Sequence, residues 1–313
     1  MAPGCIKNDE SSVGGSVLRM AIMRFTIDGS LDLRRTLRPL GLMWSVRNGD
    51  GWWKAMRTPD GPVTVRIWRD DSCVAAEAFG PGSEWAVHRI EGLVGLDDEG
   101  HAWASHHPKI ADLQHRYPGV RFGRTELVFE AAVYAIVAQK VTGKEAAAGL
   151  RGITGRFSGP APGPLGNLRL PPDPDRMAAS PYHDFHDLGI EKKRADTLRR
   201  LSADSGRVDR LAGVDVPAAM RYLARIRGVG EWTVNETLVV SHGHADAVSV
   251  GDYHLKHIVS WQLAGEARGT DERMLELLEP FRPNRGRVVR LLELAGGPQR
   301  KGPRLSVRGF ETF

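Results

Sequence analysis

Short apolar runs separated by turn residues dominate the chain from residue 21 to about residue 95. Met23–Ile27, Trp52–Met56 and Val63–Trp68 have the length and the β-branched or aromatic content of strands. Asn48-Gly49-Asp50-Gly51 and Pro59-Asp60-Gly61 lie between runs and favour tight hairpins. The pattern therefore predicts an antiparallel sheet with a helix or two against one face. Further runs of this kind are Leu42–Val46 and Cys73–Phe79.

Helical periodicity replaces this pattern further along the chain. Phe129, Val133, Ile136 and Val137 recur at helical spacing after Thr125, a residue that can cap a helix. A proline-rich loop is predicted at 156–175. Further helices are predicted over Lys192–Ala203, from Asp215-Val216-Pro217, from Thr270, and up to Gly296-Gly297.

Together these patterns predict an α+β chain with a small antiparallel β-rich N-terminal domain and an all-helical body. The predicted parts are a disordered leader at 1–20, the β-rich domain at 21–118, the helical body at 119–297 and a basic tail at 298–313.

Composition fits a soluble globular protein, with 41% hydrophobic and 26% charged residues among 313. No apolar run reaches the roughly 18 residues of a membrane span, and no signal-peptide pattern opens the chain. Cys5 and Cys73 are the two cysteines, too few for a four-cysteine metal site. We therefore expect a cytoplasmic protein without membrane contact, near the nucleoid if it is bacterial.

The net charge of +5 is uneven along the chain. Clustered cations suit a phosphate backbone, although a solvated helix face with a loose tail is the alternative. The basic residues from Phe281 onward are Arg282, Arg285, Arg287, Arg290, Arg300, Lys301, Arg304 and Arg308, against Glu293 and Glu311.

A tight turn between two helices is predicted within Leu223–Val234. One helix ends near Arg225, Gly228-Val229-Gly230 forms the turn, and a second helix begins near Glu231. The glycines permit positive φ and let a phosphate approach the backbone, where the free N–H groups of the second helix favour an anion. Such a hairpin positions DNA without reading its bases. The alternative is an ordinary helix corner with a glycine cap.

Gly228-Val-Gly-Glu-Trp-Thr233, the spacer through Asp246, and Gly251-Asp-Tyr253 together resemble a known signature. This signature resembles that of the helix-hairpin-helix DNA glycosylase superfamily. Within the superfamily, the chain is most similar to the bacterial 3-methyladenine DNA glycosylase II type. Phe129–Val141 is similar to the first core helix of that family. The resemblance spans about residues 120–295 and implies an enzyme that flips damaged bases and releases them, with alkylated bases as the leading substrate.

The resemblance places the catalytic carboxylate at Asp252. Breaking a base–sugar bond builds positive charge on the deoxyribose, which a carboxylate stabilises while it orients or activates water. The alternative role for a lone aspartate there is a helix cap.

Trp232 stands where bifunctional relatives carry a Schiff-base lysine, and an indole forms no imine. The resemblance therefore implies a monofunctional enzyme. We expect Trp232 to line the pocket by stacking on a flipped, cationic alkylpurine, with a core position as the alternative. Tyr253 is assigned to the same pocket. Glu236 and Arg290 stand where that branch has aromatic pocket residues. If both line the pocket, we expect them to pair. The pocket is then more polar and accepts a narrower range of damaged bases.

Gln139 and Lys140 stand where the family places groups that enter the gap left by the flipped nucleotide, although Lys140 is also suited to hold a phosphate. The complete set of predicted DNA contacts is Gln139, Lys140, Gly228, Val229, Gly230, Thr233, Arg285 and Arg287.

The expected partner is double-stranded DNA containing damaged bases, bound by a monomer. His183 and His186 lack further ligands, so no metal bound by side chains is expected. No organic or redox cofactor is expected, and the resemblance allows a monovalent cation on hairpin carbonyls. Two alternatives stay open: a non-catalytic DNA- or damage-binding protein on this scaffold, and a glycosylase for deaminated or oxidised bases.

Overall fold

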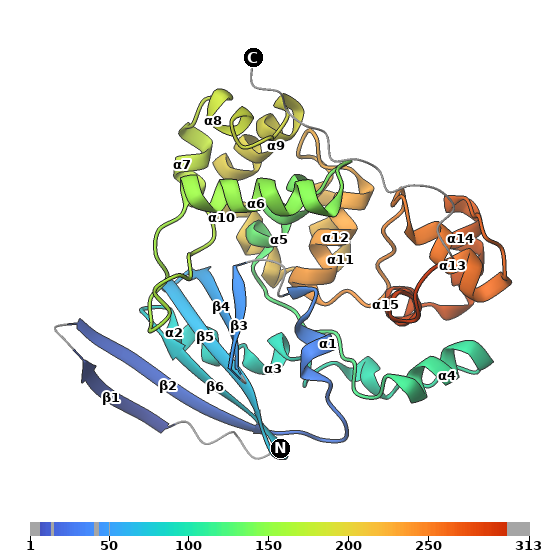
Figure 1. Cartoon of the computed structure of the whole chain (residues 1–313), viewed down its shortest axis with the longest axis horizontal. Coiled ribbons are helices and arrows are strands. Elements are labelled where there is room, and N and C mark those ends of the chain that lie inside the picture. Colours follow the sequence, from blue (N-terminus) through green and yellow to red (C-terminus); the bar gives the residue numbers. More distant parts are fainter. Residues whose placement is uncertain (1–6, 14–15, 41–43, 50, 299–313) are drawn as a thin grey trace.

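The computed structural model describes residues 7–13, 16–40, 44–49 and 51–298 of the chain. In this part, an antiparallel sheet of six strands comes first, in the order β1-β2-β6-β5-β4-β3 (Figure 1). The strands are β1 (Lys7–Val13), β2 (Ser16–Thr26), β3 (Ser45–Asn48), β4 (Gly51–Thr58), β5 (Gly61–Asp70) and β6 (Cys73–Phe79).

The strands confirm the alternation of apolar runs and turns. Thr58 pairs with Gly61 across the Pro59-Asp60 turn, and Asp70 pairs with Cys73 across the next one. The prediction of a disordered leader is wrong for residues 7–13 and 16–20, because they pair as β1 and the first half of β2. Hydrogen bonds between the two strands give these residues a regular structure that their local composition did not indicate. The basic tail from residue 299 onward lies outside the described residues.

Helices and the loops between them form the rest of the described residues. Those nearest the sheet in sequence are α1 (Leu33–Leu37), α2 (Ser83–Val87), α3 (Ile90–Leu93), η2 (Glu99–Ala102) and α4 (Pro108–Arg116). The helices that follow are α5 (Val128–Val137), α6 (Gly143–Phe157), α7 (Pro174–Ala179), α8 (His183–His186), α9 (Lys192–Ala203), α10 (Ser205–Asp209), η3 (Arg210–Gly213), α11 (Val216–Leu223), α12 (Glu231–His242), α13 (Leu255–Ala264), α14 (Asp271–Leu278), η4 (Glu279–Phe281) and α15 (Arg285–Ala295).

Most of the predicted helix starts are confirmed by cap geometry. Asp215 accepts the N–H of Ala218 at the start of α11, and Thr270 caps α14 in the same way. The predicted cap at Thr125 is wrong: α5 begins three residues later, and the Thr125 hydroxyl accepts the N–H of Leu127 before the helix.

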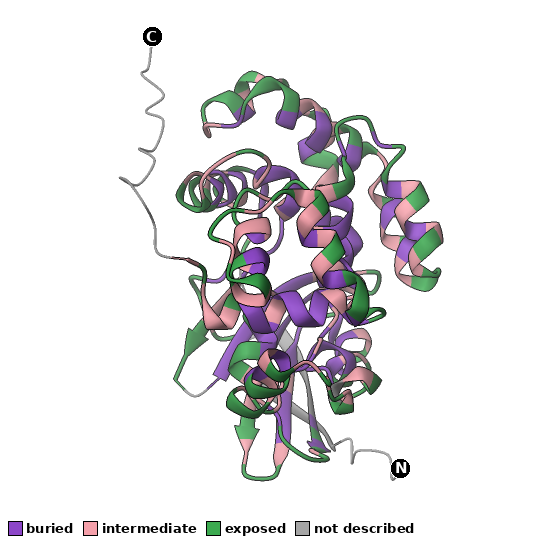
Figure 2. Cartoon of the chain, turned by 90° about the vertical axis from the view of Figure 1, so that its right-hand side faces the viewer, coloured by how far each residue is buried: buried purple, intermediate pink, exposed green. Residues whose placement is uncertain are grey.

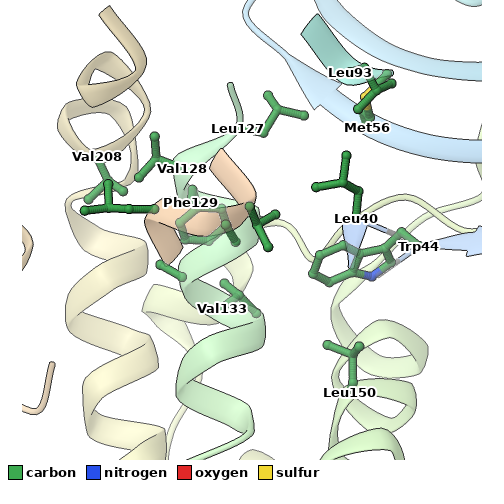
Figure 3. Packing of buried hydrophobic residues seen from close by; sticks show 14 of the residues in the cluster. Leu40, Trp44, Met56, Leu93, Leu127, Val128, Phe129, Val133, Leu150 and Val208 are labelled. Carbon is green, nitrogen blue, oxygen red and sulfur yellow. The ribbon is translucent and has the colours of Figure 1, made fainter. Parts of the chain in front are cut away.

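A hydrophobic core joins the sheet to α5. Leu40, Trp44 and Met56 lie on the sheet side of it, opposite Leu127 and Val128 at the start of α5 (Figure 3). Figure 2 shows buried residues running from the sheet through the central helices. Because α5 and α12 also pack on each other, the core fixes the hairpin relative to the sheet.

A buried ion pair crosses the same boundary. The Lys54 ammonium on β4 lies 3.3 Å from the Glu130 carboxylate on α5, and both side chains are almost fully buried. Each charge compensates the other where water is absent, so the pair fixes one alignment of helix and sheet.

The C-terminal helices form a second core together with α4. Ile110 and Leu113 of α4 pack with Val259, Met274 and Val288 from α13, α14 and α15. Helix α4 falls inside the predicted β-rich domain of residues 21–118, yet it lies beneath α15 (Figure 1). Among the described residues, no helix has the length and apolar character to cross a membrane.

Candidate functional site

The predicted hairpin between α11 and α12 is confirmed. Gly228 has φ +101°, and a Cβ there would lie 2.0 Å from Oγ1 of Thr197 on α9. Both the backbone conformation and the close approach of α9 therefore require glycine. Gly230 precedes α12 with φ −101°, and open space surrounds the place where its Cβ would stand.

Gln139 braces this hairpin from the end of α5. Its amide nitrogen donates to the Gly228 carbonyl at 3.0 Å and to Oγ1 of the buried Thr233 at 2.8 Å. Gln139 and Thr233 are thus occupied with each other, although both were predicted as DNA contacts. Lys140, the next residue, is exposed and has a left-handed backbone with φ +54°.

The loop that precedes α13 is fastened to α12. Asn235 donates to the Val248 carbonyl at 2.9 Å, and the Ser249 hydroxyl donates to Oε1 of Glu236. The backbone N–H of Asp252 donates to the Ser249 carbonyl at 3.2 Å. These bonds carry Asp252 to the side of α12 on which Glu236 lies.

Asp252 is held by the first N–H groups of the next helix. Its Oδ1 accepts from the backbone of His254 at 2.7 Å and of Leu255 at 2.8 Å. Among the described residues, nothing donates a hydrogen bond to Oδ2. The cap role considered from the sequence is therefore real, but it uses one of the two carboxyl oxygens.

Three acids act on one another here, and we call Glu236, Asp252 and Glu293 the carboxyl cluster. Burial raises the pKa of Glu236 to about 7; the Ser249 hydrogen bond lowers it, and the charges of Glu293 and Asp252 raise it further. Glu293 on α15 also has a raised pKa, mainly from burial and partly from Asp252. Its side chain reaches solvent, although many protein atoms surround it.

Arg290 lies one turn before Glu293 on α15. Its Nη2 donates to the Arg35 carbonyl at 2.5 Å. Burial lowers the pKa of Arg290 to about 10, and the charge of Glu293 opposes that shift. The conditional expectation that Arg290 pairs with Glu236 is therefore wrong, because the guanidinium is turned to α1 and influences Glu293 instead.

Solved structures of other proteins share this architecture. The 3-methyladenine DNA glycosylase of Archaeoglobus fulgidus superposes with a TM-score of 0.73 at 18% identity, over 86% of this chain and 96% of that one. The 8-oxoguanine glycosylase/lyase of Clostridium acetobutylicum, solved with double-stranded DNA that contains cytosine opposite 8-oxoguanine, gives 0.70 at 14% identity over 92% and 96%. The chain has the helix-hairpin-helix DNA glycosylase fold.

Sequence similarity is more limited. Bacillus subtilis YfjP, provisionally named as a DNA-3-methyladenine glycosylase, is 24% identical over 116 residues. That match spans 36% of this chain and 40% of YfjP. No family model matches the chain. The resemblance read from the hairpin signature is therefore confirmed at the level of the glycosylase fold.

In this glycosylase fold, Trp232 and Glu236 are one turn apart on α12 and both are half-buried, between the buried core face and solvent. Trp232 is therefore one turn from Glu236 of the carboxyl cluster, and its role in stacking on a base stays a prediction. Tyr253 is 63% exposed and contacts His254 edge-on at 4.9 Å. Its assignment to the substrate pocket therefore stays a prediction.

The two arginines chosen from charge clustering are structural. Arg287 is buried and bonds both oxygens of Asp98 at 2.6 and 2.9 Å. Arg285, 13% exposed, bonds both oxygens of Asp246 at 3.0 and 2.8 Å. Neither guanidinium is available to a phosphate, which corrects the prediction that they contact DNA.

Other basic residues surround the hairpin of the glycosylase fold and are exposed. Arg200 on α9 reaches the Arg227 carbonyl at 3.2 Å, which places it beside the turn. Lys140 is also close to the turn, because its neighbour Gln139 donates to the Gly228 carbonyl. The exposed basic residues of this hairpin surface are Lys140, Arg200, Arg225 and Arg227.

The monovalent cation stays a prediction. Hairpin carbonyls are the ligand type that such a cation takes, but those of Ile226, Arg227 and Gly228 already accept hydrogen bonds. Each keeps one lone pair for a cation. Within the described part of the chain, no group of three His, Cys, Asp or Glu side chains is placed to hold a metal ion.

Sequence reasoning missed three residues of the site. Tyr134 lies on α5, and its pKa is raised by burial and by the nearby charge of Glu236. Ser249 is hidden between two valines, and Glu293 had been counted only against the basic C-terminal residues. A polar residue that interrupts an apolar segment was the available signal for Tyr134 and Ser249.

Proposed function

We propose that this chain is a monofunctional DNA glycosylase that hydrolyses the bond between a damaged base and its deoxyribose. The observation that carries the proposal is the placement of Asp252. One of its oxygens is fixed by two backbone N–H groups, and the other accepts no hydrogen bond from the described residues. That second oxygen is suited to stabilise positive charge at C1′ and to accept a proton from water.

The hairpin surface provides the grip on DNA in this proposal. Gly230 offers an uncrowded backbone at the start of α12, where N–H groups favour a phosphate. Lys140, Arg200, Arg225 and Arg227 add exposed positive charge around it. These contacts bind the duplex irrespective of its sequence. The residues that line the pocket then determine which damaged base is released. Structural neighbours solved with DNA support a duplex as the partner.

Base release without strand cleavage follows from Trp232, which stands at the lysine position of bifunctional relatives and forms no imine. Alkylated purines are the proposed substrate class. They carry positive charge, which suits both an indole face and the Asp252 carboxylate. The names of the A. fulgidus and B. subtilis relatives agree with this class.

The test is release of 3-methyladenine and 7-methylguanine from methylated duplex DNA by wild type, Asp252→Asn and Asp173→Asn. Asp173 is a matched control, because its Oδ1 also accepts the N–H groups two and three residues ahead, at the start of α7. We expect wild type and Asp173→Asn to release both bases and Asp252→Asn to bind DNA without releasing them. Equal activity of the two variants would show that Asp252 only caps α13. If wild type releases neither base, the protein would be a DNA-binding protein without this activity or a glycosylase for another lesion.

A further inference from the structure

Glu236 is half-buried, is oriented by one hydrogen bond and has one oxygen that accepts no hydrogen bond from the described residues. Its Oε1 accepts the Ser249 hydroxyl, which holds the carboxyl group in one rotamer. Among the residues that the structure describes, no donor is bonded to Oε2. The side chain acts electrostatically on Tyr134 of α5 and is itself acted on by Asp252. No described protein group bonds the second oxygen, which is therefore available to a proton or to a substrate.

We propose that Glu236 donates a proton to the leaving base while Asp252 stabilises the sugar from which the base departs. This inference rests on the proposed glycosylase function and deepens it. Two carboxyl groups in unlike surroundings are the usual means by which a site provides an acid and a carboxylate at one pH. Here Glu236 is half-buried and accepts the Ser249 hydroxyl, whereas Asp252 is held by backbone N–H groups.

The surroundings favour the protonated form of Glu236. Burial raises its pKa to about 7, and the charges of Asp252 and Glu293 act in the same direction. From α5 it faces the neutral hydroxyl of Tyr134, and from α15 it faces Glu293, while Arg290 is bonded to the Arg35 carbonyl. A large share of the molecules therefore carries the proton near neutral pH.

The remaining helix packed on α12 adds no charge that acts on this group. On α11 the titratable side chains are Arg221, which is exposed, and Tyr222, whose hydroxyl donates to Asp204 at 2.7 Å. The charges of Arg290 and Arg38 act on Glu293 and lower its pKa.

The proposed step balances without any further reagent. The proton on Oε2 of Glu236 passes to a ring nitrogen of the base as the C1′–N bond breaks and its electron pair stays with the base. Water then attacks C1′ and gives a proton to Asp252. The products are the free base and an abasic site, and solvent returns Glu236 and Asp252 to their starting protonation states.

This role defines a second substrate class for the same pocket: neutral purines with an unsubstituted ring nitrogen that accepts a proton. A cationic base such as 7-methylguanine leaves as a neutral molecule and needs no proton. A neutral base such as hypoxanthine leaves as an anion unless it is protonated. Glu236 should therefore matter much more for hypoxanthine than for 7-methylguanine.

The experiment measures single-turnover release of each base from otherwise identical duplexes between pH 5 and pH 9. Wild type, Glu236→Gln and the control Glu276→Gln, an exposed glutamate on α14, are compared. We expect wild-type release of hypoxanthine to decline above about pH 7. For Glu236→Gln, it should fall about 100-fold more than release of 7-methylguanine does, and the decline with pH should disappear. Glu276→Gln should match wild type.

Two further variants separate acid catalysis from a structural role. Glu293→Gln removes a charge that raises the pKa of Glu236, so the decline should move to lower pH. Ser249→Ala removes the hydrogen bond that lowers it, so the decline should move to higher pH. These opposite shifts test the proposal even if Glu236→Gln does not fold.

Equal losses on both bases in Glu236→Gln, or a pH decline that is unmoved in Glu293→Gln and Ser249→Ala, would overturn the proposal. So would wild-type release of 7-methylguanine without hypoxanthine. If wild type releases neither base, the proposed glycosylase function fails as well, which is a different result from failure of Glu236 alone.

Discussion

Arg287 on α15 and Asp98 in the loop before η2 form a buried, bidentate ion pair between residues 189 positions apart. Both side chains are less than a tenth exposed. The pair fastens the helix that carries Arg290 and Glu293 to the segment that joins the sheet to α4. It explains why a basic residue in a basic stretch is unavailable to DNA.

Breaking this pair should destabilise the protein. Arg287→Met removes the guanidinium that bonds both oxygens of the buried Asp98 carboxylate, which costs about 3–5 kcal/mol in the free energy of unfolding. Urea denaturation measures the loss. Arg116→Met, in the exposed pair of α4 with Asp112, is the control and should cost less than about 1 kcal/mol. A stable Arg287→Met protein that has lost DNA affinity would instead restore a phosphate-binding role.

The two glycines of the hairpin should respond differently to alanine. Gly228→Ala places a Cβ against Thr197 at positive φ, so we expect a loss of about 1–3 kcal/mol in stability. Gly230→Ala meets open space at an ordinary φ, so stability should change by less than about 0.5 kcal/mol. Its methyl group would stand where a phosphate is proposed to approach, and duplex affinity should fall about tenfold. Thermal unfolding and DNA titration distinguish the two effects. Unchanged affinity in Gly230→Ala would place the phosphate elsewhere.

Lys140 should contribute one phosphate contact. Lys140→Ala is expected to weaken binding to any duplex and to reduce the slope of log affinity against log salt by about one. Titrations at several salt concentrations measure this slope. Lys109→Ala, at a half-buried lysine on α4 beside the second core, is the control and should leave the slope unchanged. Equal slopes for Lys140→Ala and wild type would assign Lys140 to the gap left by the flipped base or to solvent.

Glu236 should make the protein less stable as the pH rises. Its pKa is raised in the folded state from the ordinary 4.5 to about 7, so the folded protein holds a proton that the unfolded chain has released. Stability therefore falls between about pH 4.5 and pH 7. Glu236→Gln removes this dependence and should be more stable than wild type at pH 8 by about 2 kcal/mol, discounted for partial exposure. Urea midpoints at pH 5 and pH 8 check this. Parallel changes in the two proteins would contradict it.

Local patterns in the sequence determined much of the fold. Apolar runs with turn residues specified the hairpins of β4, β5 and β6, and capping residues located the starts of α11 and α14. The Gly228–Gly230 turn was readable because glycine at positive φ is a local requirement. Each of these features depends on interactions within a few residues, so the chain order alone expresses them.

Only the tertiary structure decided how distant residues meet. It paired Arg287 with Asp98, directed Arg290 to the Arg35 carbonyl, and brought Glu236, Asp252 and Glu293 from three separate segments into one site. Residues 7–13 became a strand because β2 was there to pair with them. The charge on a side chain is written in the sequence, but its availability to DNA and its affinity for a proton depend on burial and on partners that folding supplies.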